Sequence, residues 1–287
     1  MTLREALTLY LEHASDLKPG TRKRLTYDVN RWERLGGPMD VASIDKHAIK
    51  AFRAAAAGLS PWSIEGTVSA ILVMLRFLSD DGHDVSVPYA GRRLRRRKQL
   101  RHVPSVQDLA RVFGECGKAR YPVLSHCSTG DWWRAFLVTA YTTGLRLSDL
   151  LSLEWEHVGE ARWLVVAGKT EKIQALPLLP CCTLALNRIR SPRERIFEVP
   201  TVRFLRRELR RMSQWAGVTT ILPQAIRRTS ANAYETARPG AGAMILGHAL
   251  SGATAFYVSP SLVLTDAAAK LEIPPEFTGA TPSFALR

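Results

Sequence analysis

The first ninety residues carry apolar side chains at helical spacing. Four segments repeat apolar residues at i, i+3, i+4 and i+7, the period of an amphipathic helix. They are LREALTLYLEHASDL, GTRKRLTYDVNRWERLG, IDKHAIKAFRAAAAG and WSIEGTVSAILVMLRFLSDDG. Clusters of Gly, Pro and Asp separate them, and Thr2 with Glu5 forms the pattern of a capping box at the start of the first. Four short helices joined by tight turns predict a compact helical bundle over residues 1–90.

From residue 105 onward the helical period continues, with one interruption. SVQDLARVFGECGKARYP and DWWRAFLVTAYTTGLRLSDLLSLEW predict helices, the first capped by Ser105 with Asp108. In ARWLVVAGKTEKIQALPLLP two short β-forming runs flank residues 168–171, which predicts a hairpin. Helical spacing returns in RFLRRELRRMSQWAG, QAIRRTSANAYETA, AGAMILGHA and SGATAFYVS. The predicted fold is therefore mainly α with a small β-hairpin.

The amino-acid composition predicts a polyanionic binding partner. A chain of 287 residues, 46% of them hydrophobic, is long enough for two folded domains. A net charge of +14 predicts attraction to nucleic acid, with an anionic membrane surface as the alternative. No apolar run approaches the roughly twenty residues of a membrane span, and the N-terminus lacks the pattern of a signal peptide. A cytoplasmic protein without a membrane partner is expected.

A dense run of positive charge lies in residues 91–104, which we call the basic linker. A block of like charge stays extended and solvated, so the linker is expected to separate two domains. A targeting address or a plain spacer would also explain it, but a linker that contacts DNA fits the overall charge better. The expected DNA-binding residues here are Arg92, Arg93, Arg95, Arg96, Arg97 and Lys98, with Arg101 and His102 after them.

Neither a cofactor nor a metal is expected. Cys116, Cys127, Cys181 and Cys182 have no Cys-x-x-Cys spacing, and His126 beside Cys127 lacks a second pair of ligands. The Gly-Lys-Thr at 168–170 lacks the upstream glycine of a Walker loop. The acidic residues form no cluster suited to two catalytic metal ions. Reduced thiols are the expected state of the cysteines.

Five side chains suited to phosphate chemistry follow one another in the second half. They are Arg146 in TTGLRLSDLLSL, Lys169 in the hairpin, Arg227 in QAIRRTSA, and His248 and Tyr257 in LGHALSGATAFY. Together they could cut and rejoin a phosphodiester without metal or ATP. Each also has an ordinary explanation: a surface ion pair with Asp149, a solvated turn lysine, a helix start on the DNA backbone, a core histidine and a core aromatic residue.

The order and local sequence of these residues resemble the catalytic domain of the tyrosine recombinases, the phage-integrase-type enzymes, over roughly Pro104 to Pro260. The resemblance implies that Arg146 and Arg227 clamp the scissile phosphate and that Asp149 supports Arg146. It also implies that Lys169, rather than its rival Lys172, protonates the leaving 5′ oxygen. His248 would contact the phosphate and Tyr257 would be the nucleophile.

The resemblance extends more loosely to the N-terminal helices, where GLSPWSIEGTVSAILVMLRFL is similar to the core-binding domain of the same family. It implies a core-binding domain over residues 1–90, the basic linker over 91–104, and a catalytic domain with a tail helix over 105–287. Arg228 is expected to contact the DNA backbone beside Arg227.

Gln224 is the main departure from the family, which has histidine three residues before its second catalytic arginine. Glutamine can donate a hydrogen bond to phosphate but cannot take up a proton. Water or the phosphate then removes the tyrosine proton, or the enzyme is slow, or the protein is an inactive DNA-binding paralogue.

A site-specific DNA recombinase is the predicted function, with a type IB topoisomerase and a DNA-binding paralogue as alternatives. Double-stranded DNA and further copies of the chain, as a tetramer on paired sites, are the expected partners, in association with the nucleoid. SLVLTDAAAKLEI predicts a tail helix with Thr265 as N-cap and a stripe of Ala267, Ala268, Leu271 and Ile273. The stripe has to be buried, on its own domain or, as the resemblance implies, on a neighbouring copy.

Overall fold

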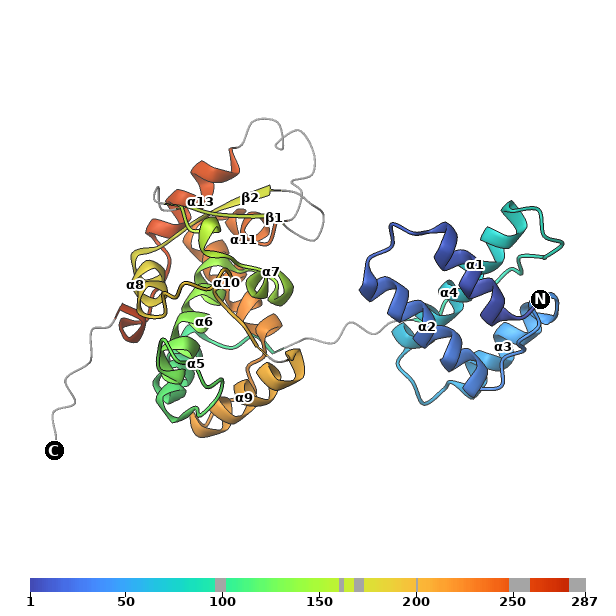
Figure 1. The fold of residues 1–287 in the computed structure, drawn as a ribbon, viewed down its shortest axis with the longest axis horizontal. Coiled ribbons are helices and arrows are strands. Elements are labelled where there is room, and N and C mark those ends of the chain that lie inside the picture. The colour runs from blue at the N-terminus through green and yellow to red at the C-terminus, as the bar shows by residue number, and fades with distance from the viewer. Residues whose placement is uncertain (96–101, 160–162, 168–172, 200, 248–258, 279–287) are drawn as a thin grey trace. The chain divides into compact units, whose positions relative to one another are not determined.

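The structure is a computed structural model that divides into two compact units, Met1–Leu100 and Arg101–Arg287 (Figure 1). The residues that it describes are 1–95, 102–159, 163–167, 173–199, 201–247 and 259–278.

The first unit is the predicted helical bundle. Its elements are α1 (Leu3–His13), α2 (Pro19–Arg34), η1 (Val41–Ser43), α3 (Lys46–Ala55) and α4 (Pro61–Asp80). Thr2 and Glu5 form the expected capping box on α1. In the core, Trp32 of α2 stacks on Phe52 of α3, with ring centroids 4.8 Å apart. The stacking helps to join α2 to α3.

Helix α4 bears on the expectation that the chain has no membrane span. Among the described residues, this twenty-residue helix, with a mean hydropathy of 1.3, is long and apolar enough to cross a membrane by length and composition only. However, 56% of that apolar window is buried inside the unit, where Met74, Leu75 and Leu78 lie in the core. The apolar residues of α4 are explained by its place as a core helix.

The second unit is mainly helical with one small sheet, which confirms the predicted fold class. Its helices up to the sheet are α5 (Val106–Glu115), η2 (Cys116–Lys118), α6 (Thr129–Thr143), α7 (Leu147–Leu151) and η3 (Trp155–His157). Strands β1 (Trp163–Ala167) and β2 (Ile173–Pro177) pair antiparallel, with Trp163 opposite Pro177 and Ala167 opposite Ile173. The remaining helices are α8 (Pro180–Arg188), α9 (Val202–Trp215), α10 (Pro223–Ala237), α11 (Ala241–Ile245), α13 (Pro260–Ala269) and η4 (Pro275–Thr278).

Helix α6 lies in the middle of this unit, among α5, α8 and α10 (Figure 1). Trp132, Trp133, Phe136 and Tyr141 along it are fully buried. Because α6 is surrounded by other elements, it fixes the frame to which they attach.

The structure breaks the single helix that was predicted across residues 131–155. Helix α6 ends at Thr143, and Gly144 caps it in the left-handed conformation, with φ +57°. A Cβ on Gly144 would lie 3.0 Å from Ser230 Oγ and 3.3 Å from Ile245 Cγ1. The chain then turns, and Arg146 becomes the N-cap of α7 instead of lying inside a helix.

The tail helix begins earlier than predicted. Helix α13 starts at Pro260 with Ser259 at the N-cap, and Thr265 lies inside it, where its hydroxyl donates to Ser261 O. Proline suits the first helical position, because its missing N–H has no acceptor there. Val263, Leu264 and Ala267 are buried in the core of their own domain. In this structure the apolar face therefore packs within the chain.

Gly144→Ala should lower the free energy of unfolding by about 2–5 kcal/mol, because a left-handed alanine costs about 1–2 kcal/mol and overpacking adds about 1–3 kcal/mol. Urea denaturation measures this change. Gly217→Ala is the matched control, because Gly217 also has a positive φ, +64°, but open space around the new Cβ. Equal losses in the two variants would contradict the close packing at Gly144.

Candidate active site

Arg146 and Asp149 lie on one turn at the start of α7. The Arg146 side chain is 40% exposed, and its Nη1 lies 3.8 Å from Oδ2 of the buried Asp149, an ion pair rather than a hydrogen bond. The Ser148 hydroxyl donates to Asp149 Oδ1 at 3.1 Å and holds the carboxylate in place. The Arg146 guanidinium therefore pairs with Asp149 and is otherwise accessible to solvent.

Arg227 is buried, with only 6% of its surface exposed. Its Nη1 donates to Gly144 O, and its Nη2 donates to Leu246 O at 2.7 Å. Gly144 caps the C-terminus of α6 and Leu246 caps that of α11, so the side chain joins α10 to the ends of two other helices. Carbonyls at helix C-termini lack intrahelical donors, which makes them favourable partners for a cation.

The two arginines interact through space. Burial, and to a smaller extent the positive charge of Arg146, lowers the pKa of Arg227 to about 10, against the opposing effect of Asp149. Arg227 stays protonated at neutral pH, but its charge is poorly compensated. Two guanidiniums beside a single buried carboxylate therefore form a site that an anion would stabilise. A phosphate, which accepts hydrogen bonds from guanidinium N–H groups, matches this arrangement.

Of the other predicted catalytic residues, the structure describes only Gln224. It is exposed in the first turn of α10, three residues before Arg227. Lys169, its rival Lys172, His248 and Tyr257 lie outside the described residues. The structure therefore brings Arg227 close enough to Arg146 and Asp149, which lie far earlier in the chain, for their charges to affect its pKa.

The structure describes only some of the predicted DNA-binding residues. Arg92, Arg93 and Arg95 are exposed, whereas Arg96, Arg97 and Lys98 lie outside the described residues. Arg228 is half-buried and donates from Nη2 to the backbone oxygen of His102, 3.3 Å away. Its guanidinium contacts the basic linker.

Sequence reasoning missed a second basic surface. Helix α9 exposes five arginines, Arg203, Arg206, Arg207, Arg210 and Arg211. Glu208, 2% exposed, pairs with Arg207 and Arg211 at 3.1 and 3.3 Å. The segment RFLRRELRRM held the signal, since its apolar residues fall on one helical face and leave the arginines on the other.

Two other groups of reactive side chains have structural explanations. Glu154, Glu156 and His157 lie close enough to hold a metal ion, but His157 Nδ1 accepts a hydrogen bond from the Glu154 backbone and caps η3. The thiols of Cys116, Cys181 and Cys182 are buried, and burial raises the pKa of Cys181 to about 12. Such thiols are poor nucleophiles at neutral pH.

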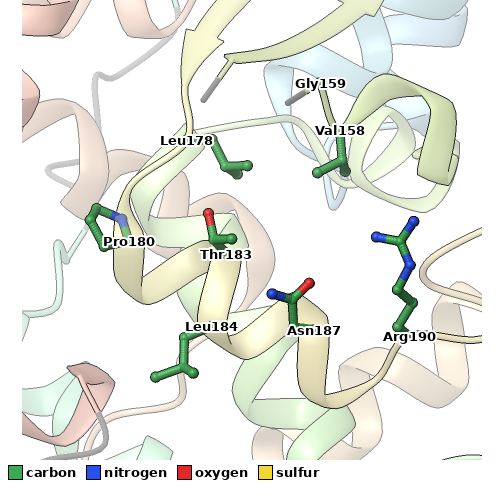
Figure 2. Close-up of a pocket in the computed structure, with 8 residues that line it drawn as sticks. All are labelled: Val158, Gly159, Leu178, Pro180, Thr183, Leu184, Asn187 and Arg190. Atoms are coloured by element: carbon green, nitrogen blue, oxygen red, sulfur yellow. The ribbon is translucent and has the colours of Figure 1, made fainter. Parts of the chain in front are cut away.

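Figure 2 shows an open pocket of about 650 Å³ beside α8. It is lined by Val158, Gly159, Leu178, Pro180, Thr183, Leu184, Asn187 and Arg190. Arg190 also lies over the Trp155 ring, 5.3 Å from its centroid. The described lining includes none of the residues predicted to act on DNA.

Residues 123–260 match the sequence model of the phage integrase family. The match covers most of the second unit and slightly less than half of the chain. The matched range contains Arg146, Asp149 and Arg227, so the arginine site lies within the part that defines the family. The resemblance to the tyrosine recombinases is confirmed.

Curated relatives include two proteins named tyrosine recombinase XerC. The one from Xylella fastidiosa (strain 9a5c) is 32% identical over 142 residues, 48% of this chain and 46% of the relative. The one from Xanthomonas campestris pv. campestris (strain B100) is 31% identical over 150 residues, 51% of this chain and 44% of the relative. The chain thus spans about half the length of these two relatives.

Solved structures share the fold at low identity. A lambda integrase dimer bound to a COC′ core site has a TM-score of 0.69 and 18% identity, covering 86% of this chain and 95% of that one. The Tn1549 transposon integrase in complex with transposon right end DNA has a TM-score of 0.68 and 16% identity, covering 93% and 94%. The integrase fold therefore accounts for most of the chain.

Arg227→Ala should lower the free energy of unfolding by at least about 2 kcal/mol, because it leaves two carbonyls without their charged donor. Arg146→Ala should change it by less than about 1 kcal/mol, since an exposed ion pair contributes little. Chemical denaturation of the two variants, side by side, measures both. Similar stability losses would contradict the structural role given to Arg227.

Proposed function

We propose that the protein is a site-specific DNA recombinase that cuts and rejoins strands through a 3′-phosphotyrosyl intermediate. The observation that carries the proposal is that Arg146 pairs with the buried Asp149 and that both charges act on the buried Arg227, within the phage integrase match. The relatives named tyrosine recombinase favour this function over a type IB topoisomerase or a DNA-binding paralogue.

In the proposed reaction the phenol oxygen of Tyr257 attacks the scissile phosphorus. The Tyr257 Oη–P bond forms as the bond from phosphorus to the 5′ oxygen breaks. The phenol proton passes to water or to a phosphate oxygen, and Lys169 protonates the departing oxygen. Arg146, Arg227 and His248 stabilise the charge of the phosphorane. A 5′-hydroxyl of the partner strand then attacks the phosphotyrosine and releases Tyr257. Each step exchanges one phosphodiester for another, so no energy source is consumed.

The proposed partners are double-stranded DNA and further copies of the chain. The net charge of +14 and the exposed Arg92, Arg93 and Arg95 of the basic linker support a DNA partner. A solved lambda integrase tetramer bound to a Holliday junction, with a TM-score of 0.69 to this chain, supports a tetramer on paired sites. We propose that the tail helix, packed on its own domain here, moves to a neighbouring copy at that stage. A double-stranded DNA partner is consistent with the proposed cytoplasmic location in association with the nucleoid.

Tyr257→Phe should abolish covalent attachment to DNA and leave binding nearly intact, because the phenol oxygen is the nucleophile and adds little to affinity. A nicked suicide substrate, tested across candidate sites, traps the covalent complex for gel analysis. Arg146→Ala in the same assay should cost on the order of 10²-fold in cleavage, as the loss of a preorganised donor does. Trapping by the Phe variant would show that another residue attacks.

Gln224→His tests how the tyrosine loses its proton. Imidazole accepts a proton only when neutral, so the variant's cleavage rate should rise with pH through about 6.5, an inflection that the wild type lacks. Single-turnover cleavage between pH 5.5 and 8 measures the profile. Profiles of the same shape in both proteins would show that a residue at position 224 does not act as the base.

A further inference from the structure

Tyr234 is a fully buried tyrosine that the proposed reaction does not use. It lies on α10 two helical turns after Arg227, so the two side chains extend from the same face of the helix. The Tyr234 hydroxyl donates to Thr142 O of α6 at 2.8 Å. Burial raises the pKa of Tyr234 above its ordinary value, so the hydroxyl stays protonated and remains a donor.

This hydroxyl binds one of the last carbonyls of α6. Such carbonyls lack intrahelical donors, so a buried helix end needs donors from elsewhere in the fold. Thr142 is fully buried, and Tyr234 supplies the donor for its carbonyl. Arg227 supplies the donor for the carbonyl of Gly144, two residues further on. Helix α10 therefore holds the end of α6 at two separate points.

The same end of α6 leads directly to Arg146. Only the buried Leu145 lies between Gly144 and Arg146, and the Arg146 carbonyl then accepts from Leu150 N at 2.8 Å as α7 begins. One attachment would leave the end of α6 free to rotate about that contact, whereas two attachments fix both its place and its direction. The point from which Arg146 extends is therefore set relative to α10, the helix that carries Arg227.

The contact of Arg227 with Gly144 is a weaker anchor than that of Tyr234. Under the proposed function the Arg227 guanidinium also donates to the phosphate, so its bond to Gly144 O has to adjust when DNA binds. A tyrosine hydroxyl has one O–H to donate, and that of Tyr234 goes to Thr142 O. The Tyr234 bond can thus hold α6 in place while Arg227 binds.

We propose that Tyr234 is a positioning residue for the arginine pair, and that its hydrogen bond to the end of α6 fixes the separation of the Arg146 and Arg227 guanidiniums. The inference rests on the proposed recombinase function, in which both guanidiniums bind one phosphate. Because that ligand is small, the two donors tolerate little change in separation. A misplacement of about 1 Å can cost on the order of 10²-fold in rate.

Tyr234→Phe removes the hydroxyl and keeps the ring. Single-turnover cleavage of a nicked suicide substrate at saturating protein should slow about three- to tenfold, the range that one lost hydrogen bond produces. Binding of the same DNA should keep its Kd, because Tyr234 is buried and does not reach the ligand. Cleavage at the wild-type rate by this variant would overturn the proposal.

Tyr141→Phe is the matched control. Tyr141 is also fully buried, and its hydroxyl also donates to a backbone carbonyl, that of Glu272, at 2.7 Å. Glu272 follows α13, so this bond does not attach the end of α6 to α10. The control should lose similar stability against urea and cleave like the wild type. Equal slowing of both variants would indicate a general loss of packing and would contradict a positioning role.

Combining Tyr234→Phe with Arg146→Ala tests whether Tyr234 acts through Arg146. Once that guanidinium is gone, its position no longer matters, so Tyr234→Phe should cause no further loss of cleavage in the double variant. If the two losses multiply instead, Tyr234 acts on some other step and the proposal fails.

The wild type separates this inference from the proposed function. Its failure to cleave at any site would count against the recombinase function. The attachment is then judged by amide hydrogen exchange at Gly144, whose N–H donates to Ala140 O in the last turn of α6. Exchange should be several times faster in Tyr234→Phe than in Tyr141→Phe. Equal exchange rates would show that Tyr234 does not hold the end of α6.

Discussion

The second unit depends on one buried cation. Burying Arg227 costs free energy. The hydrogen bonds from its guanidinium to the carbonyls that end α6 and α11 offset this cost. Those carbonyls would otherwise lack donors, so each partner satisfies the other. The left-handed Gly144 allows this contact by turning α6 sharply enough for its last carbonyl to face α10. Helix packing and the arrangement of the candidate site are therefore set by the same few hydrogen bonds.

Buried carboxylates extend this principle to both units. Each holds at least one arginine, and the pairs are Asp149 with Arg146, Glu65 with Arg53, Glu208 with Arg207 and Arg211, and Asp28 with Arg24 and Arg31. Removing a carboxylate from water costs free energy, and the attraction to its arginine largely offsets that cost. These pairs therefore add little net stability. The ion pairs instead fix the orientation of the arginines. An arginine already held by a carboxylate loses less conformational entropy when it binds an anion.

Local patterns were sufficient to predict most of the fold. The helices and the hairpin follow from apolar spacing, and the capping boxes at Thr2 and Ser105 depend on residues only three apart. The break at Gly144 escaped prediction because the apolar period continues across it from α6 into α7. Ser259 was missed as the N-cap of α13 because Thr265 offers the same hydroxyl, and only the proline after Ser259 distinguishes them. The contact between Arg227 and Gly144 spans 83 residues of sequence, and no local pattern encodes it. For the same reason the orientation of Arg228 toward the linker could be found only in three dimensions.

The unequal burial of the two site arginines has an evolutionary consequence. Under the proposed function, a descendant that no longer cuts DNA gains nothing from Arg146, whose guanidinium is open to solvent, and can lose it by drift without harm to folding. The same descendant must keep Arg227, because selection for a stable domain retains it. Among diverged homologues, an arginine at position 227 is thus evidence only of a preserved fold, whereas an arginine at position 146 would be evidence of the proposed use on DNA.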